Sequence, residues 1–220
     1  MMKIQTKKEN IEIPVDGKKV YGDLNLIEDS KGIVLFAYGS GSSRFSPRER
    51  FVSDKMNELG ISTLFMDLLT KEEETIDEET REYRFDISLL ADRLGDAIRW
   101  AKKDTRTKNM KMGLFGGSTG ASACLIAAAK YFGEISVVVS RGGRTDLADE
   151  KLSQITAATL FIVGEDDYEV LELNRTSFKL LKCKNKKLEI IDGATHLFEE
   201  AGKLEEVADL ACHWFLKNLR

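Results

Sequence analysis

The sequence MKMGLFGGSTGASAC, residues 110–124, is the most informative stretch of this chain. It opens with the apolar run MKMGLF, which predicts a buried strand, and after GGSTG it enters small residues that predict a helix. Gly-x-Ser-x-Gly between a strand and a helix is typical of a sharp turn that exposes the serine, where side chains at Gly116 and Gly120 would meet neighbouring backbone. The pattern indicates a nucleophile at Ser118, and a plain strand-to-helix turn is the alternative.

On both sides of this stretch, short β-branched runs alternate with longer segments of helical period, as in βαβ units. The sequence predicts one α/β domain over residues 1–220, with a mostly parallel central sheet of about eight strands and helices on both faces. Ile11–Val15 and Lys19–Leu26 flank the turn signal Asp16-Gly17 and predict an antiparallel hairpin at the sheet edge. The other expected strands are Gly32–Ala37, Ser62–Met66, Met110–Phe115, Ile135–Ser140, Ala158–Val163 and Lys187–Ile191. The expected helices are Pro47–Leu59, Phe85–Lys103, Thr119–Tyr131, Val170–Leu181 and Lys203–Leu219.

One segment fits neither pattern. Leu69–Tyr83 is rich in Glu and Asp and has little apolar periodicity, which predicts a solvated excursion outside the core. A lid over a site is the second interpretation of this segment.

The composition of the chain limits the kinds of molecule that we expect it to bind. The 220 residues have a formal net charge of −4, so the chain has no basic surface of the kind that neutralises phosphates, and nucleic acid is not an expected partner. Met1–Asn10 lacks the apolar run of an export signal, and no apolar run in the chain is long enough to span a membrane. Cys124, Cys183 and Cys212 are odd in number and widely spaced, which favours a reducing cytoplasm and argues against a zinc site.

Histidine is scarce, so few general bases are available. His213 falls on the polar side of the last predicted helix, which indicates a solvated residue. His196 follows the last predicted strand, at the carboxyl edge where sites of open α/β sheets form. We therefore expect His196 to be the base, with an ordinary loop residue as the alternative.

The acid is expected after the strand Ala158–Val163, where Glu165, Asp166, Asp167 and Glu169 lie within five positions. A surface turn that caps the next helix would look similar. The order Ser, Asp, His along the chain is the order of the α/β-hydrolase fold. An oxyanion hole is expected from the amides of Thr119 and of Ser40, which lies in the loop after the first parallel strand.

Taken together, these residues resemble the dienelactone-hydrolase-like family of the α/β-hydrolase superfamily, from about Gly32 to the C-terminus. In that family the acid is the Asp of a Gly-x-x-Asp-x-x-Val segment, which matches Gly164, Asp167 and Val170 and favours Asp167. Similar domains also occur joined to phosphoribosyltransferase domains. The resemblance rests on GSGSSR (39–44), SPR (46–48), DLLT (67–70), GLFGGSTG (113–120), SRGGR (140–144) and GATHLFEE (193–200).

Two positions depart from the family's pattern. Dienelactone hydrolases proper use a cysteine nucleophile where this chain has Ser118, so dienelactone itself is not the expected substrate. Related chains usually have His where this chain has Tyr38, a change that bears on how the loop around Ser40 is held.

Three arginines, Arg44, Arg141 and Arg144, are expected near the carboxyl edge of the sheet. Guanidinium groups there can bind a substrate carboxylate in a bidentate manner, and the resemblance implies an acidic substrate. The other interpretation is that they pair with acidic neighbours such as Asp146, Asp149 or the 69–83 segment and fasten loops.

The expected activity is that of a serine hydrolase acting on a small-molecule ester, lactone or related acyl bond, with Ser118, His196 and Asp167 as its triad. Acyl transfer of this kind needs no metal and no organic cofactor. Two alternatives use the same pocket: a non-catalytic ligand-binding protein of this fold, and an acyltransferase with the same triad.

Overall fold

The computed structural model of the chain describes residues 6–30 and 32–219, so the first half of the Met1–Asn10 segment lies outside it. A hairpin of β1 (Thr6–Val15) and β2 (Lys18–Ile27) forms one edge of the sheet. Its strands pair antiparallel through Asp16 and Gly17, whose φ angles of 44° and 74° suit the tight two-residue turns of hairpins. The predicted hairpin is confirmed.

The remaining strands complete a single eight-stranded sheet in the order β1-β2-β4-β3-β5-β6-β7-β8. β2 pairs antiparallel with β4, and every pairing from β4 to β8 is parallel. The central strands are buried along their whole length because helices cover both faces, which explains their nearly continuous apolar sequences. These central strands are β3 (Ile33–Ala37), β4 (Ser62–Met66) and β5 (Met112–Gly117). Next come β6 (Ile135–Arg141) and β7 (Ala158–Gly164), each buried except for one residue, and the partly exposed edge strand β8 (Lys186–Ile191).

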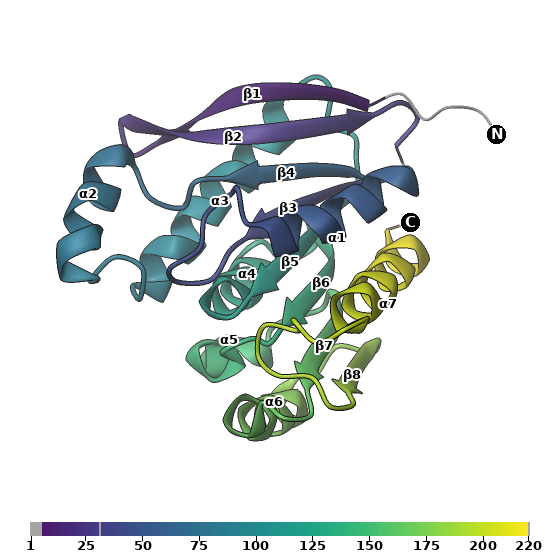
Figure 1. Cartoon of the computed structure of the whole chain (residues 1–220). Coiled ribbons are helices and arrows are strands. Elements are labelled where there is room, and N and C mark those ends of the chain that lie inside the picture. The colour runs from purple at the N-terminus through teal and green to yellow at the C-terminus, as the bar shows by residue number, and fades with distance from the viewer. Residues whose placement is uncertain (1–5, 31, 220) are drawn as a thin grey trace.

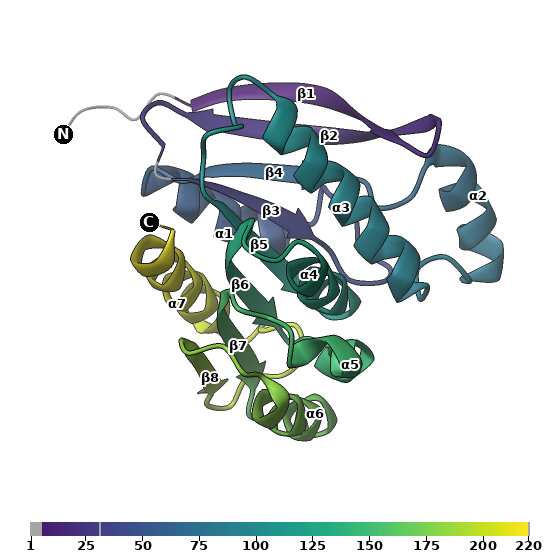
Figure 2. The same cartoon turned by 180° about the vertical axis from the view of Figure 1, so that it is seen from behind.

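Helices pack on the two faces of the sheet, as predicted. α1 (Pro47–Glu58) and α7 (Lys203–Asn218) lie together on the face turned to the viewer in Figure 1. The opposite face, in front in Figure 2, bears α3 (Ile87–Lys103), α4 (Thr119–Lys130), α5 (Asp149–Leu152) and α6 (Tyr168–Leu180), and the 3₁₀ turn η1 (Thr145–Ala148) precedes α5. None of the helices in the described ranges is both long enough and apolar enough to cross a membrane.

The acidic segment 69–83 contains a helix that the sequence pattern did not predict. α2 (Lys71–Thr80) begins at a capping box: the Thr70 hydroxyl accepts from the Glu73 amide, and the Glu73 carboxylate accepts from the Thr70 amide. Nearly all of its residues are partly or fully exposed, in agreement with the predicted solvated excursion, and only Asp77 is buried. The helix stands beyond the end of the sheet, at the left of Figure 1.

The strand that precedes Ser118 differs from its prediction at both ends. β5 starts at Met112 because the Met110 amide donates to the Thr107 carbonyl and so belongs to the preceding turn. It also continues through Gly116 and Gly117, and Ser118 links it to α4, which begins at Thr119. The carboxyl ends of β3, β5, β6, β7 and β8 therefore meet at one edge of the sheet, and the loops from that edge build the site.

Candidate active site

Ser118 forms the tight turn between β5 and α4. Its φ of 50° and ψ of −122° lie in a region that side chains rarely adopt, and two hydrogen bonds hold it there. The Ser118 amide donates to the Arg141 carbonyl, and the Arg144 amide donates to the Ser118 carbonyl, both at 3.1 Å. The side chain remains partly exposed while the residues on either side of it are buried.

The two flanking glycines are sterically required, as predicted. A Cβ at Gly120 would lie 2.2 Å from the Ala37 carbonyl oxygen, and a Cβ at Gly116 would lie 2.5 Å from the Ala121 Cα. Both contacts are with backbone, which cannot move aside as a flexible side chain can. The sequence thus folds into the strand–turn–helix geometry of an exposed serine.

His196 and Asp167 come together at the same edge. The His196 Nδ1 and Asp167 Oδ2 atoms lie 2.6 Å apart, and the Asp167 side chain is only 13% exposed. A hydrogen bond from Nδ1–H to the carboxylate fixes the tautomer that leaves Nε2 without a hydrogen, as a general base requires. The other histidine, His213, is exposed on α7, as predicted.

The segment between β6 and η1 connects the serine to the histidine. Arg141 and Arg144 bond the Ser118 backbone, while a Cβ at Gly142 would lie 3.4 Å from the His196 ring. In the described part of the chain no hydrogen bond joins the Ser118 hydroxyl to His196. Such bonds are often long before substrate binds, so the two groups remain a candidate pair.

The loop after β3 packs directly on the serine. A Cβ at Gly39 would lie 2.8 Å from the Ser118 Cβ, so only glycine allows this approach. The next amide, that of Ser40, donates a 2.8 Å hydrogen bond to the Thr119 Oγ1. The structure thus brings the predicted oxyanion residues Ser40 and Thr119 together, through a contact that sequence spacing could not predict.

Tyr38 holds the same loop from its other side. Its phenol oxygen accepts a 2.8 Å hydrogen bond from the Leu68 amide, at the end of β4. Burial raises the pKa of the Tyr38 phenol, so the group stays neutral. The tyrosine that replaces the family's usual histidine therefore tethers the β3 loop to β4.

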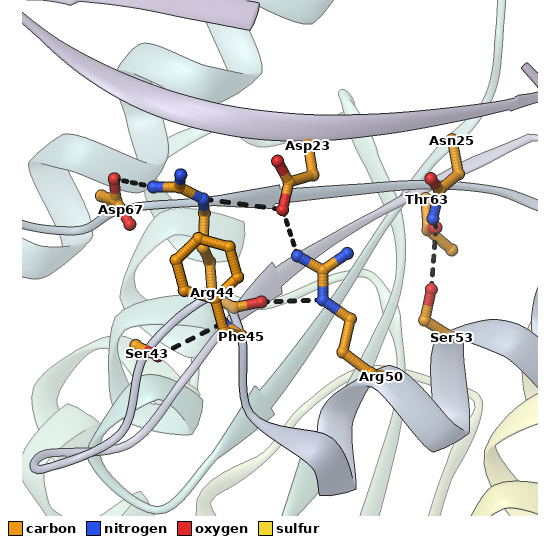
Figure 3. A network of polar contacts seen from close by, with 9 residues as sticks. All are labelled: Asp23, Asn25, Ser43, Arg44, Phe45, Arg50, Ser53, Thr63 and Asp67. Atoms are coloured by element: carbon orange, nitrogen blue, oxygen red, sulfur yellow. Dashed lines mark hydrogen bonds and ion pairs between the residues drawn. The ribbon is translucent and has the colours of Figure 1, made fainter. Parts of the chain in front are cut away.

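Arg44 belongs to an ion-pair network between this loop and the antiparallel edge of the sheet (Figure 3). Its guanidinium binds Asp67 after β4 and lies 3.5 Å from the Asp23 carboxylate on β2. Arg50 on α1 also binds Asp23 and donates to the Arg44 carbonyl at 2.8 Å. Burial raises the pKa of Asp67 although Arg44 opposes the shift. The network fastens the 39–46 loop.

The other two arginines are also paired with carboxylates. Arg141 is buried and binds Glu49 of α1 at 2.6 Å, and the Ser46 hydroxyl donates to the same carboxylate. Arg144 binds Asp146 through two hydrogen bonds of 3.0 and 2.9 Å. All three arginines are thus paired as in the loop-fastening interpretation, and substrate binding by Arg44, Arg141 and Arg144 stays a prediction. Sequence reasoning missed Glu49, although it directly follows the quoted SPR motif.

A cavity of about 200 Å³ opens beside the Ser40 loop, between this loop, the end of β4 and α2. Its acidic lining comes from Asp67 and from α2, which contributes Glu74, Asp77 and Glu78, and Arg84 is the one basic residue. Arg84 is itself bound to Asp77, and Asp67 to Arg44. The cavity adjoining the predicted oxyanion loop is therefore acidic.

Comparison with known proteins identifies several that are similar to this chain. A crystal structure of a dienelactone hydrolase from Anabaena variabilis is 46% identical, with a TM-score of 0.96 over 98% of this chain and 100% of that one. Est1E from Butyrivibrio proteoclasticus is 16% identical with a TM-score of 0.80 over 94% and 98% of the two chains, which shows a shared fold. No family model matches the chain.

A curated Mycobacterium tuberculosis protein named "Putative phosphoribosyl transferase" is 46% identical over 213 residues, which are 96% of this chain and 46% of that protein. The chain thus spans about half the length of the curated relatives it matches. The similarity to the Anabaena protein extends over nearly all of this chain and all of that one, and the sheet order and the serine turn agree with that relationship. The chain belongs to the dienelactone-hydrolase-like family of α/β-hydrolase-fold proteins.

Proposed function

We propose that this protein is a serine hydrolase that cleaves a small carboxylic ester or lactone through a triad of Ser118, His196 and Asp167. The observation that supports it best is the 2.6 Å contact between His196 Nδ1 and Asp167, in a loop packed against the segment that also bonds Ser118. An imidazole oriented in this way can accept the proton of a serine hydroxyl.

In the proposed reaction, His196 Nε2 takes the proton from Ser118 as the serine oxygen attacks the carbonyl carbon. The imidazolium is stabilised by Asp167 and then gives the proton to the leaving alcohol, which departs as the acyl-enzyme forms. Water, deprotonated by the same histidine, attacks the acyl-enzyme and releases the acid. The negative charge that develops on the carbonyl oxygen lies at the N-terminus of α4, where the helix dipole favours it.

The cavity supports a small substrate that is not anionic. Its lining includes Ser40 but none of the proposed triad residues, so it could take only a part of the substrate that extends past the Ser40 loop. Its 200 Å³ suits a compact group, and Glu74 and Glu78 would repel a carboxylate there. Each of the three arginines discussed above already pairs with a carboxylate of the protein itself. These arginines are Arg44, Arg141 and Arg144. We therefore expect neutral esters to have a higher kcat/KM than their carboxylate-bearing analogues.

The proposal is tested by labelling with a fluorophosphonate probe and mapping the modified peptide. We expect the probe to modify Ser118, because an unactivated serine hydroxyl is too weak a nucleophile at neutral pH. Ser118→Ala should lose both labelling and hydrolysis of a short p-nitrophenyl ester. Ser153 is an exposed serine at the C-terminal end of α5. Ser153→Ala is the matched control and should keep both labelling and hydrolysis.

Two outcomes of these experiments would favour a different function. Failure of the wild-type protein to label would favour the non-catalytic binding protein of the same fold. If labelling occurs but added alcohol is acylated faster than water, the triad serves an acyltransferase.

A further inference from the structure

The Ser40 amide is already committed to a partner inside the protein. It donates to the Thr119 Oγ1 at 2.8 Å, a full-strength hydrogen bond for a nitrogen donor. An amide hydrogen that is aimed at a side-chain oxygen is not aimed at the carbonyl oxygen of a substrate. One of the two donors expected from the fold is therefore engaged elsewhere.

The Thr119 hydroxyl, by contrast, has a hydrogen to donate. A hydroxyl group has one hydrogen and two acceptor lone pairs, and Ser40 uses only a lone pair. Among the described residues, no group accepts a hydrogen bond from the Thr119 hydroxyl. An accepted hydrogen bond also polarises the hydroxyl and strengthens it as a donor.

The position of Thr119 fits this use. It directly follows Ser118, is only 3% exposed and is the first residue of α4, where the backbone amides lack partners within the helix. Its branched side chain has few rotamers, and the bond from Ser40 selects one of them. The amide and the hydroxyl of a single residue are thus held next to the nucleophile.

We propose that Thr119 supplies both donors of the oxyanion hole, its amide and its hydroxyl, and that the Ser40 amide positions the hydroxyl instead of binding the substrate. This inference rests on the proposed serine hydrolase activity. As Ser118 attacks, the carbonyl π electrons move onto the oxygen. That oxygen accepts two hydrogen bonds, one from the Thr119 amide and one from the Thr119 hydroxyl, and neither donor gives up its proton. When the tetrahedral intermediate collapses, the C=O bond is restored and the leaving group departs with the proton from His196.

Three variants test the assignment on the short p-nitrophenyl ester. Thr119→Val replaces the hydroxyl with a methyl group of similar size, and we expect kcat to fall by about 10²–10³-fold, as for other oxyanion donors. KM should change little, because the contact strengthens only in the transition state. Thr119→Ser keeps the hydroxyl and should recover most of the loss. Thr107→Val removes a buried hydroxyl that bonds the Ala101 carbonyl, away from the site, and serves as the matched control.

The contrary result is equally definite. If kcat of Thr119→Val equals or exceeds that of the wild type, the released Ser40 amide is the donor and the inference is wrong. Thr119→Ala, which adds no methyl group beside the Ser40 amide, gives the same comparison if the valine variant does not fold by circular dichroism. Fluorophosphonate labelling of wild-type Ser118 separates the two proposals: labelling together with an active Thr119→Val variant rejects only the role of Thr119.

Discussion

Three of the four carboxylates after β7 have different hydrogen-bond partners, although the sequence makes them look equivalent. Glu165 accepts a hydrogen bond from the Gly193 amide at 3.1 Å, and Asp166 accepts one from the Tyr168 hydroxyl. Asp167 is the residue that reaches the histidine, because it lies at the start of α6 with its side chain turned toward the 193–202 loop. The Gly-x-x-Asp-x-x-Val match and the geometry thus favour the same residue.

We expect Asp167→Asn to lower kcat by about 10⁴-fold, because an amide no longer holds the imidazole in the tautomer that accepts the serine proton. Asp166→Asn, one residue away and exposed, is the matched control and should change kcat by less than about threefold. The same assay should show a loss of similar size for His196→Ala and almost none for the exposed His213→Ala. Equal losses at Asp166 and Asp167 would leave Asp167 without its proposed role.

Residue patterns predicted the local backbone of the site better than its long-range contacts. Gly116, Gly120 and Ser118 could be assigned because their roles follow from local backbone geometry, which spacing determines. The partners of Arg44 and Arg141 could not, because Asp23, Asp67 and Glu49 come from elements far apart in the sequence. The sequence alone does not distinguish an arginine that binds substrate from one that binds a neighbouring carboxylate.

At the scale of elements, α2 shows how a helix forms without an apolar stripe. Polar contacts hold it: Asp77 accepts from the amides of Tyr83 and Arg84 and from the Arg84 side chain, and Glu73 binds Arg93 of α3 at 2.7 Å. A search for hydrophobic periodicity cannot find such a helix. The capping pair of Thr70 and Glu73 was the one available signal.

The buried Asp77 is the main anchor of α2. Burial alone would raise its pKa, but the hydrogen bonds and charge of Arg84 outweigh burial and lower the pKa below the ordinary value of 3.8. A carboxyl whose folded pKa is lowered stabilises the fold at pH values above its ordinary pKa. This stabilisation is lost as the pH falls through the lowered value.

We expect Asp77→Asn to lower the free energy of opening of α2 by about 1.5–3 kcal/mol at neutral pH, because it removes hydrogen bonds to a charged group. Hydrogen exchange of residues 71–80 should be faster in this variant, and wild-type α2 should reach similar exchange only in acid. Glu79→Gln, at an exposed position of the same helix, is the control and should exchange like the wild type. Unchanged protection of α2 in Asp77→Asn would show that other contacts hold the helix.

Across the whole molecule, the sequence predicted the class, the edge hairpin, the number of strands and the longer helices of the two faces, but not η1 and the short α5. These features could be predicted because the apolar content of a strand and the hydrophobic periodicity of a helix or strand are properties of each segment by itself. The order of the strands, with β4 between β2 and β3, depends on which segments pair, and no single segment records that choice. Element ends moved by a few residues where turns compete, as at Met110.

The Glu49–Arg141 pair joins α1 to β6 beneath the serine turn, and both side chains are at most 6% exposed. We expect Arg141→Met to lower the free energy of unfolding by about 3–5 kcal/mol, because Glu49 is left buried without its partner. The double variant Arg141→Met/Glu49→Leu should recover much of this loss in urea denaturation. Arg175→Met breaks an exposed pair with Glu172 and, as the control, should cost less than about 1 kcal/mol.

Additive losses in the double variant would contradict an energetic link between Glu49 and Arg141. A substrate-binding role for Arg141 makes a separate prediction, a selective loss of activity on anionic esters. The ion pair instead predicts that neutral and anionic esters are affected alike.

The position of the proposed triad along the chain has a consequence for biosynthesis. The ribosome completes β5 and Ser118 before it adds Asp167, which follows β7, and His196, which follows β8. Because chains emerge from the N-terminus onward, a nascent chain already contains the serine before its partners exist. A nascent chain in which Ser118 has emerged but residue 196 has not therefore has the proposed nucleophile without the proposed base, and on this proposal it is not yet reactive toward esters.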